Sequence, residues 1–304
     1  MKINKRFLQC IAALQILIFH LWMPLTNTTI EQFLIKTGYM GVDLFFFLSA
    51  YSLAGKTISY GSFLKNRVVL LYAKFAFFVG LMAVSNATFG IHRILKSLTF
   101  FEFFQKGGGA FLWFLPAILL FYLLYPLFLK WESRWKVLLV LFLWMVGSIV
   151  LEKGFSYTAI FIFTNRIPII LAGYVLRKKS IPRWLIVVFL PVGIAFMYFF
   201  GFYRKLHFPI RDMYYVLMVP MVISLVILSS YVKKSRIWDV LGSATLELYA
   251  LQMIFAQKIV FGLYFEVKNP LLTNIGVLLV FFALAFLLKG VFVKMAALWK
   301  KVRN

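Results

Sequence analysis

The feature that most constrains this chain is a series of long apolar runs in which charged residues are almost absent. A helix needs about 20 apolar residues to cross the hydrocarbon core of a bilayer. About ten runs reach or approach that length. They are residues 7–25, 37–55, 68–88, 110–129, 137–151, 158–176, 184–202, 213–232, 239–264 and 271–293. Backbone polar groups in lipid must be satisfied within the chain, so these runs predict transmembrane helices.

The composition excludes an ordinary soluble domain. Hydrophobic residues make up 63% of the chain and charged residues 14%, whereas soluble domains average about 45–50% and about 25%. The 33 Lys and Arg against 9 Asp and Glu are the kind of balance seen in nucleic-acid-binding proteins. Here the basic residues fall mainly in short loops, where they act as topology signals. We therefore expect a lipid bilayer as partner and no nucleic acid.

The distribution of these basic residues predicts the topology. Most Lys and Arg fall in the loops that share a side with the N-terminus, which places both termini in the cytoplasm. We expect an all-α, polytopic bundle of about ten spans in the plasma or inner membrane. Residues 1–304 form a single membrane domain in this interpretation, with no appended soluble domain. One outer stretch, "FFEFFQK" (100–106), is amphipathic and can lie flat on the membrane surface.

Ionisable groups inside apolar runs are costly and are therefore functional candidates. They are His20, Asp43, Lys74, Arg166, Glu247, Lys258 and Lys289. The two last lysines can snorkel to the interface and receive little weight. His20 and Asp43 fall at similar depths in the first two runs. A carboxylate beside an imidazole would suit general-base chemistry, but the pair can equally be a polar tie between helices.

Three further polar positions stand out. Gln9 precedes His20 by eleven residues, so the two side chains project from nearly the same helix face, about 16 Å apart. Glu247 and Gln252 share the ninth run; Gln252 can be interhelical hydrogen-bond glue, whereas Glu247 needs a partner, for which Arg166 is one possibility. The single Cys10 excludes an internal disulfide and a cysteine-based metal site, and the scattered histidines give no metal-ligand spacing.

Several motifs, in this order, resemble the acyltransferase-3 family of membrane O-acyltransferases. The most specific match is "GYMGVDLFFFLSAY" (38–51), which is similar to the family element G-x-x-G-V-D/E-x-F-F-x-x-S-G-F/Y. The other matching segments are "IAALQILIFH" (11–20), "FLKNR" (63–67), "FLWFLPAILLFYLLYPL" (111–127), "RIPIILAGYVL" (166–176) and "WDVLGSATLELY" (238–249). Ten core spans and a cytoplasmic N-terminus are also what this resemblance implies.

The chain departs from the family pattern at four positions. Gln9 stands where the family has an arginine before the histidine of the first span, and Leu70 replaces the second arginine of an Arg-x-x-Arg pair that begins at Arg67. Gln252 occupies a position that is often histidine, and Ala50 one that is usually glycine. Arg6 lies one turn before Gln9 and can replace the lost basic group.

The resemblance implies an enzyme that transfers an acyl group, expected to be acetyl, from cytoplasmic acyl-CoA to a cell-surface polysaccharide or lipid-linked sugar. Acyl-CoA is then a co-substrate, and no bound cofactor or metal is expected. By analogy His20 is the base and Asp43 orients it, while the donor binds near Gln9, Lys65, Arg67 and Lys74. The supporting and acceptor-side positions are Ser49, Trp113, Arg166, Glu247 and Gln252.

Two other functions remain open at this point. The replaced arginines are compatible with a diverged member that acts as a non-catalytic scaffold in glycan assembly. The many spans and a basic outer segment, "YRKLH" (203–207), would suit a transporter or polymerase of surface glycan. The ordered set of motifs favours the transferase, although a fold-level analogy alone does not establish a function.

Overall fold

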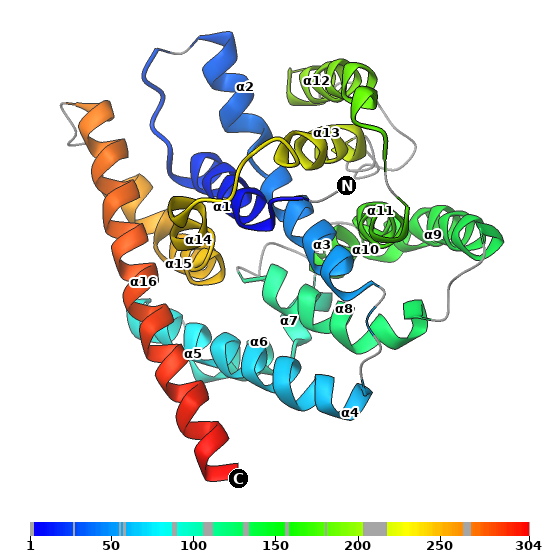
Figure 1. The fold of residues 1–304 in the computed structure, drawn as a ribbon. Helices are drawn as coiled ribbons and strands as arrows, with labels where there is room; N and C mark the ends of the chain where they lie inside the picture. Colours follow the sequence, from blue (N-terminus) through cyan, green and yellow to red (C-terminus); the bar gives the residue numbers. More distant parts are fainter. Residues whose placement is uncertain are drawn as a thin grey trace. The chain divides into compact units, whose positions relative to one another are not determined.

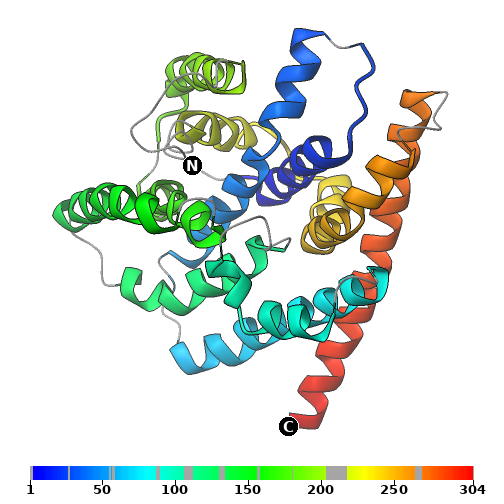
Figure 2. The same cartoon turned by 180° about the vertical axis from the view of Figure 1, so that it is seen from behind.

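The computed structural model describes residues 3–26, 28–54, 56, 59–86, 90–105, 112–129, 134–155, 158–179, 181–202, 218–263 and 269–303. The predicted segment 203–207 lies outside these residues. All regular elements in the described ranges are helices, which confirms the all-α prediction (Figures 1 and 2). The chain divides into two compact units, one built mainly from Val42–Leu228 and the other from Asn4–Gly41 with Ser229–Asn304.

The second of these units, which we call the His20 unit, contains five helices in the part of it that the structure describes. They are α1 (Lys5–Leu21), α2 (Thr29–Thr37), α14 (Arg236–Leu241), α15 (Thr245–Leu263) and α16 (Pro270–Arg303). Helix α15 packs against both α1 and α16, and α1 also contacts α2 and α14 (Figure 1). The unit therefore places α1 and α15, which carry most of the polar candidates of this unit, against each other.

Polar side chains fix both ends of α1. The Asn4 side chain caps the helix by accepting a hydrogen bond from the Phe7 N–H, which satisfies one of the exposed donors of the first turn. Its Nδ2 donates to the carbonyls of Val232 and Lys233. At the other end, the buried Asn274 of α16 bonds both the N–H and the carbonyl of Met23. Helices α1 and α16 are thus tied in a fixed register.

Two glycines of the second motif allow α1 to approach the following segment at backbone distance. A Cβ atom added to Gly38 would lie 2.2 Å from the Gln15 carbonyl oxygen, and one added to Gly41 would lie 2.1 Å from that of Ala12. Neither approach is possible for any residue with a side chain unless the backbone moves. The paired glycines of the motif are therefore explained by close packing against α1 within the His20 unit.

The other unit, which we call the Asp43 unit, holds most of the remaining helices. They are α3 (Met40–Leu53, whose first two residues belong to the His20 unit), α4 (Tyr60–Phe63), the π-helix η1 (Leu64–Val68), α5 (Val69–Ser85), α6 (Ile91–Leu98), α7 (Phe101–Phe104), α8 (Phe114–Leu129), α9 (Arg134–Phe155), α10 (Ala159–Thr164), α11 (Ile167–Lys178), the 3-10 helix η2 (Arg183–Leu185), α12 (Ile186–Phe202) and α13 (Val219–Ser229). Its core is aromatic, with Phe46 packed edge-on against Phe114.

Within the described ranges, three helical stretches are long and apolar enough to cross a membrane on length and composition: Tyr60–Ser85, Ala159–Lys178 and Pro270–Leu298. Helices α2 and α3 meet the same test together as a bent pair, and five shorter apolar helices accompany them. These helices make the chain a membrane protein. The expected total of about ten spans, and the cytoplasmic termini, stay predictions.

The described helices depart from the predicted runs in three places. The run 239–264 is divided at Gly242–Ser243 into α14 and α15, the run 158–176 is divided at Asn165–Arg166 into α10 and α11, and the predicted loop 26–36 contains α2. Helix α2 starts at the N-cap Thr28, whose hydroxyl accepts the Glu31 N–H, and Glu31 in turn accepts the N–H groups of Leu25 and Thr26. This Thr-x-x-Glu spacing is a known helix-start signal.

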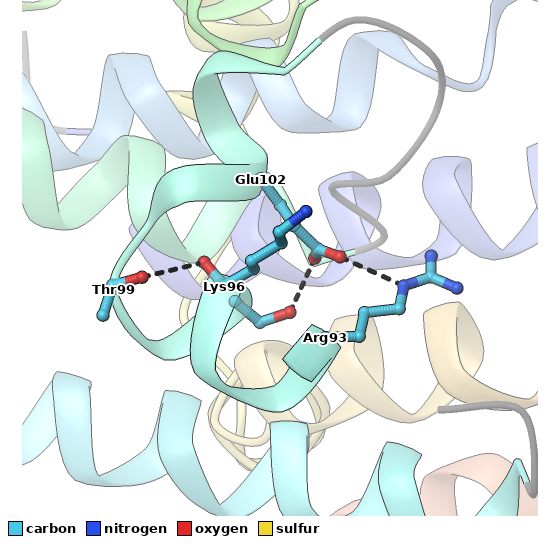
Figure 3. A network of polar contacts seen from close by, with 5 residues as sticks. Arg93, Lys96, Thr99 and Glu102 are labelled. Atoms are coloured by element: carbon cyan, nitrogen blue, oxygen red, sulfur yellow. Dashed lines mark hydrogen bonds and ion pairs between the residues drawn. The ribbon is translucent and has the colours of Figure 1, made fainter. Parts of the chain in front are cut away.

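The amphipathic stretch predicted from "FFEFFQK" belongs to a corner between α6 and α7; its last residue, Lys106, lies outside the described ranges. The buried carboxylate of Glu102 pairs with Arg93 at 3.0 Å and accepts the Ser97 hydroxyl (Figure 3). Phe101 and Phe104 remain exposed. The acidic group thus points inward and the rings outward, as an interfacial segment requires.

Candidate functional site

His20 lies in the last turn of α1 and is half-buried. The Phe19 ring meets the imidazole edge-on, with ring centroids 4.8 Å apart. No hydrogen bond to the imidazole is formed by the described residues of the His20 unit. The ring is therefore held by packing, and its nitrogens are not committed to a structural hydrogen bond within that part of the chain.

Helix α15 brings two of the predicted polar residues into the same unit. Gln252 is 0% exposed and Glu247 is 2% exposed. Neither the oxygen nor the nitrogen of the Gln252 amide has a hydrogen-bond partner among the described residues. The Oε1 of Gln15 on α1 is also buried and also lacks a partner among them. A buried polar atom without a partner costs about 1–3 kcal/mol, so such groups in a native fold call for an explanation.

At the start of α1, Gln9 is linked to Arg6. The Arg6 Nη1 donates to the Gln9 Oε1 and to the Gly242 carbonyl, each at 3.1 Å. The guanidinium therefore lies at the tip of the Gln9 side chain, one turn away from its own Cα. This geometry supports the interpretation that Arg6 supplies the positive charge that the family has at the Gln9 position.

Asp43 forms a buried ion pair in the other unit. Its Oδ1 lies 3.2 Å from the Arg166 Nε, and the two side chains are 0% and 2% exposed. Neither carboxylate oxygen accepts an aligned hydrogen bond from the described residues, so the attraction is mainly Coulombic. Arg166 also donates to the Ile162 carbonyl at 2.7 Å and lies over the Trp113 ring, 5.1 Å from its centroid.

This ion pair bears on two expectations. Asp43 is one partner of Arg166, and the sequence did not anticipate this pair; the possible pairing of Arg166 with Glu247 joins residues of different units and stays a prediction. The expected contact between Asp43 and His20 joins residues of different units, and it stays a prediction. Because α10 ends and α11 begins at Asn165 and Arg166, the pair attaches α3 to a break in a long apolar segment.

The predicted donor-binding residues of the Asp43 unit lie on one continuous helical stretch. Lys65 and Arg67 are exposed and belong to η1, a π-helical turn; such turns occur often at functional sites. Lys74 is half-buried on α5 and Ser49 is half-buried on α3. The structure therefore distributes the predicted site between its two units, with Gln9, His20, Glu247 and Gln252 in the His20 unit and the others in the Asp43 unit.

Sequence reasoning missed two polar features. Asn165, beside Arg166, is 0% exposed and both of its amide atoms lack a partner among the described residues. Lys289, which was expected to snorkel, instead donates from Nζ to the Ser243 Oγ at 2.5 Å. The sequence did contain a signal for Asn165, because its amide lies beside the charged Arg166 in the middle of the apolar run 158–176. Nothing in the local sequence pairs Lys289 with Ser243.

The described residues contain no group of three or more His, Cys, Asp and Glu side chains that could hold a metal ion.

Comparison with known proteins identifies the family. A family model described as an acyltransferase domain matches residues 6–292, which is nearly the whole chain and covers most of both segments of the His20 unit. No curated protein and no solved structure matches the chain. With the motifs in family order and a match of this extent, the chain belongs to the acyltransferase-3 family of membrane acyltransferases.

Proposed function

We propose that this protein is a multi-pass O-acyltransferase of the plasma or inner membrane, which transfers an acetyl group from cytoplasmic acyl-CoA to a hydroxyl of a surface polysaccharide or lipid-linked sugar. The observation that carries the proposal is the placement of His20. His20 lies at one end of α1, and the Arg6–Gln9 pair lies at the other. Helix α15 packs against α1 and carries Gln252, whose buried amide has no hydrogen-bond partner among the described residues. Base, amide donor and cation thus belong to one compact unit.

The proposed chemistry needs one base and one oxyanion donor. The His20 imidazole takes the proton from the sugar hydroxyl, and the sugar oxygen attacks the thioester carbonyl. The Gln252 amide N–H stabilises the negative charge that develops on the carbonyl oxygen. The C–S bond then breaks, and the CoA thiolate takes back the proton from the imidazolium. The sugar ester and free CoA leave, with His20 neutral again.

The remaining predicted residues receive supporting roles in this proposal. Glu247, 2% exposed on α15, is suited to holding the acceptor or ordering the Gln252 amide, and Ser49 is a second candidate donor to the oxyanion. Trp113 offers an aromatic face of the kind that sugars stack against. Arg166 is assigned to the acceptor side, and Asp43 keeps its expected role of orienting His20. Both are positioning residues in this proposal, because their charges are already paired with each other.

The test compares surface glycans by mass spectrometry in the wild type, a deletion strain, and strains that carry His20→Ala or His92→Ala. His92 is an exposed histidine on α6 and serves as the matched control. The proposal predicts that one acetyl mass disappears in the deletion and His20→Ala strains and persists with His92→Ala, at equal membrane expression. General-base catalysis typically contributes about 10²–10⁴-fold, so the loss should be near complete.

The same experiment separates the alternatives. Acetylation that persists with His20→Ala would remove the histidine from catalysis. Loss in the deletion strain but not in any His20 variant would indicate a scaffold for another enzyme. A change in glycan length or amount, with acetylation unchanged, would favour the transporter or polymerase.

A further inference from the structure

Two cations from different helices meet at the turn between α14 and α15. The Arg6 Nη1 of α1 lies 3.1 Å from the Gly242 carbonyl oxygen, and the Lys289 Nζ of α16 lies 2.5 Å from the Ser243 Oγ. Gly242 and Ser243 are consecutive residues, so the two positive groups are held at neighbouring points of one turn. Helices α1 and α16 therefore each bring one positive group to the turn between α14 and α15, and all four helices belong to the His20 unit.

The turn is shaped for this convergence. A Cβ atom on Gly242 would lie 2.3 Å from the Arg6 carbonyl oxygen, so only glycine lets the turn approach the first turn of α1 so closely. The Ser243 hydroxyl donates to the Val240 carbonyl, which leaves its oxygen lone pairs to accept from Lys289. The position of each cation is thus set by specific groups rather than by general proximity.

Every acceptor used by the two cations is neutral. Arg6 donates to an amide oxygen and a carbonyl, and Lys289 donates to a hydroxyl. In the described ranges, no carboxylate lies within ion-pair distance of either side chain. Lys289 also sits half-buried within the apolar stretch Pro270–Leu298, where an unneutralised charge is costly and marks a functional position by default. Two like charges held together without a counter-charge favour an anionic ligand.

We propose that Arg6 and Lys289 form a phosphate-binding site at the Gly242–Ser243 turn, and that this site holds phosphate groups of the acyl-CoA donor. The planar guanidinium can bind two phosphate oxygens at once, and the lysine adds a point charge beside it. This inference rests on the proposed function and relocates donor binding from Lys65 and Arg67 to the His20 unit. The headgroup of an anionic lipid presents the same phosphate chemistry.

The position along α1 fits a donor of this kind. Arg6 precedes His20 by fourteen residues, or about 21 Å of helix. Acyl-CoA carries its phosphates and its thioester at opposite ends of a long, flexible pantetheine arm. If Arg6 holds the phosphates, the pantetheine arm can extend along α1 and bring the thioester towards the His20 imidazole. The family arginine lost at Gln9 is replaced by a residue from the preceding turn together with one from α16.

The test measures binding, so that it does not depend on turnover. The full chain is placed in nanodiscs of neutral lipid and titrated with CoA, with dephospho-CoA and with pantetheine by isothermal calorimetry. Arg6→Gln and Lys289→Gln should each weaken CoA binding about tenfold, or about 1.4 kcal/mol, and leave pantetheine binding unchanged. Arg6→Lys should retain most of the affinity. Lys294→Gln removes an exposed charge from the same helix and should change the affinity less than about twofold.

A second arm identifies the source of the phosphate. The variants are moved to nanodiscs that contain phosphatidylglycerol, and the thermal stabilisation by this lipid is measured. Loss of that stabilisation with CoA affinity unchanged would support a phosphate site but overturn its assignment to the donor. Unchanged binding of both ligands would overturn the site itself, as would an effect on CoA confined to Lys65→Gln and Arg67→Gln. If the wild-type protein binds no CoA, the proposed function fails first.

Discussion

Replacing Asp43 with asparagine tests the buried ion pair directly. The Oδ1–Nε distance of 3.2 Å corresponds to roughly 5 kcal/mol of attraction at an effective dielectric constant of about 20. Removing one partner of a buried pair leaves an uncompensated charge and costs about 3–5 kcal/mol. Arg166 keeps its bond to the Ile162 carbonyl and its place over Trp113. We therefore expect Asp43→Asn to fall at the lower end, about 3 kcal/mol.

The assay is thermal unfolding of the purified protein in detergent. A loss of about 3 kcal/mol should lower the Tm by roughly 6–12 °C, from the usual slope of about 2–4 °C per kcal/mol for chains of roughly 150–250 residues. Asp239→Asn, which removes an exposed carboxylate from α14, is the matched control and should stay within about 0.5 kcal/mol. The double variant Asp43→Asn with Arg166→Gln should be more stable than the sum of the single changes predicts, because neither charge is then left alone.

The outcome also decides what Asp43 does. If Asp43→Asn leaves the Tm within about 1 °C of the wild type, the Coulomb argument is refuted. A large loss of activity per folded molecule in that case would support a carboxylate that orients His20. Equal losses of activity and stability would indicate a structural tie between α3 and the α10–α11 break. Measuring acetyl transfer on the folded fraction alone separates these cases.

Two further predictions follow from packing and from the outer corner. Gly41→Ala forces a Cβ against the Ala12 carbonyl oxygen and should cost about 1–3 kcal/mol in thermal unfolding, whereas Gly80→Ala meets open space and should be neutral or stabilising by up to about 1 kcal/mol; equal effects would contradict the close approach. Glu102→Gln removes the charge that holds Arg93 and should increase protease cleavage within residues 90–105, with little change in global Tm.

Sequence periodicity located most helices because a run of apolar residues long enough for a bilayer leaves the backbone few other choices. It did not locate the breaks within those runs. The division at Gly242–Ser243 depends on a close approach to α1, and that approach is a tertiary contact. Helix α2 was different, since Thr28 and Glu31 carry a local start signal that could have been read from the sequence.

The sequence singles out individual polar residues as candidates, but it does not show which of them contact each other. Asp43 and Arg166 were each identified because a charged side chain is costly inside a membrane. Helical periodicity, however, shows only on which face of its helix a residue lies and does not identify its partner on another helix. For Lys289 the sequence led to the opposite error, because a residue with a specific contact was given little weight. A lysine in an apolar run is usually able to snorkel, so only the contact with Ser243 distinguishes it from a surface residue.

The most specific motif of the chain combines two physical functions, and this accounts for its length. Gly38 and Gly41 remove side-chain volume where the backbone of α1 approaches, and so they position the helix that carries His20. Two residues after Gly41, Asp43 holds Arg166 at the start of α11. Substituting a glycine should therefore disturb the His20 unit, and substituting the aspartate should disturb the Asp43 unit. Helix α3 contributes residues to both units, so one continuous motif supplies the glycine contacts of the His20 unit and the ion pair of the Asp43 unit.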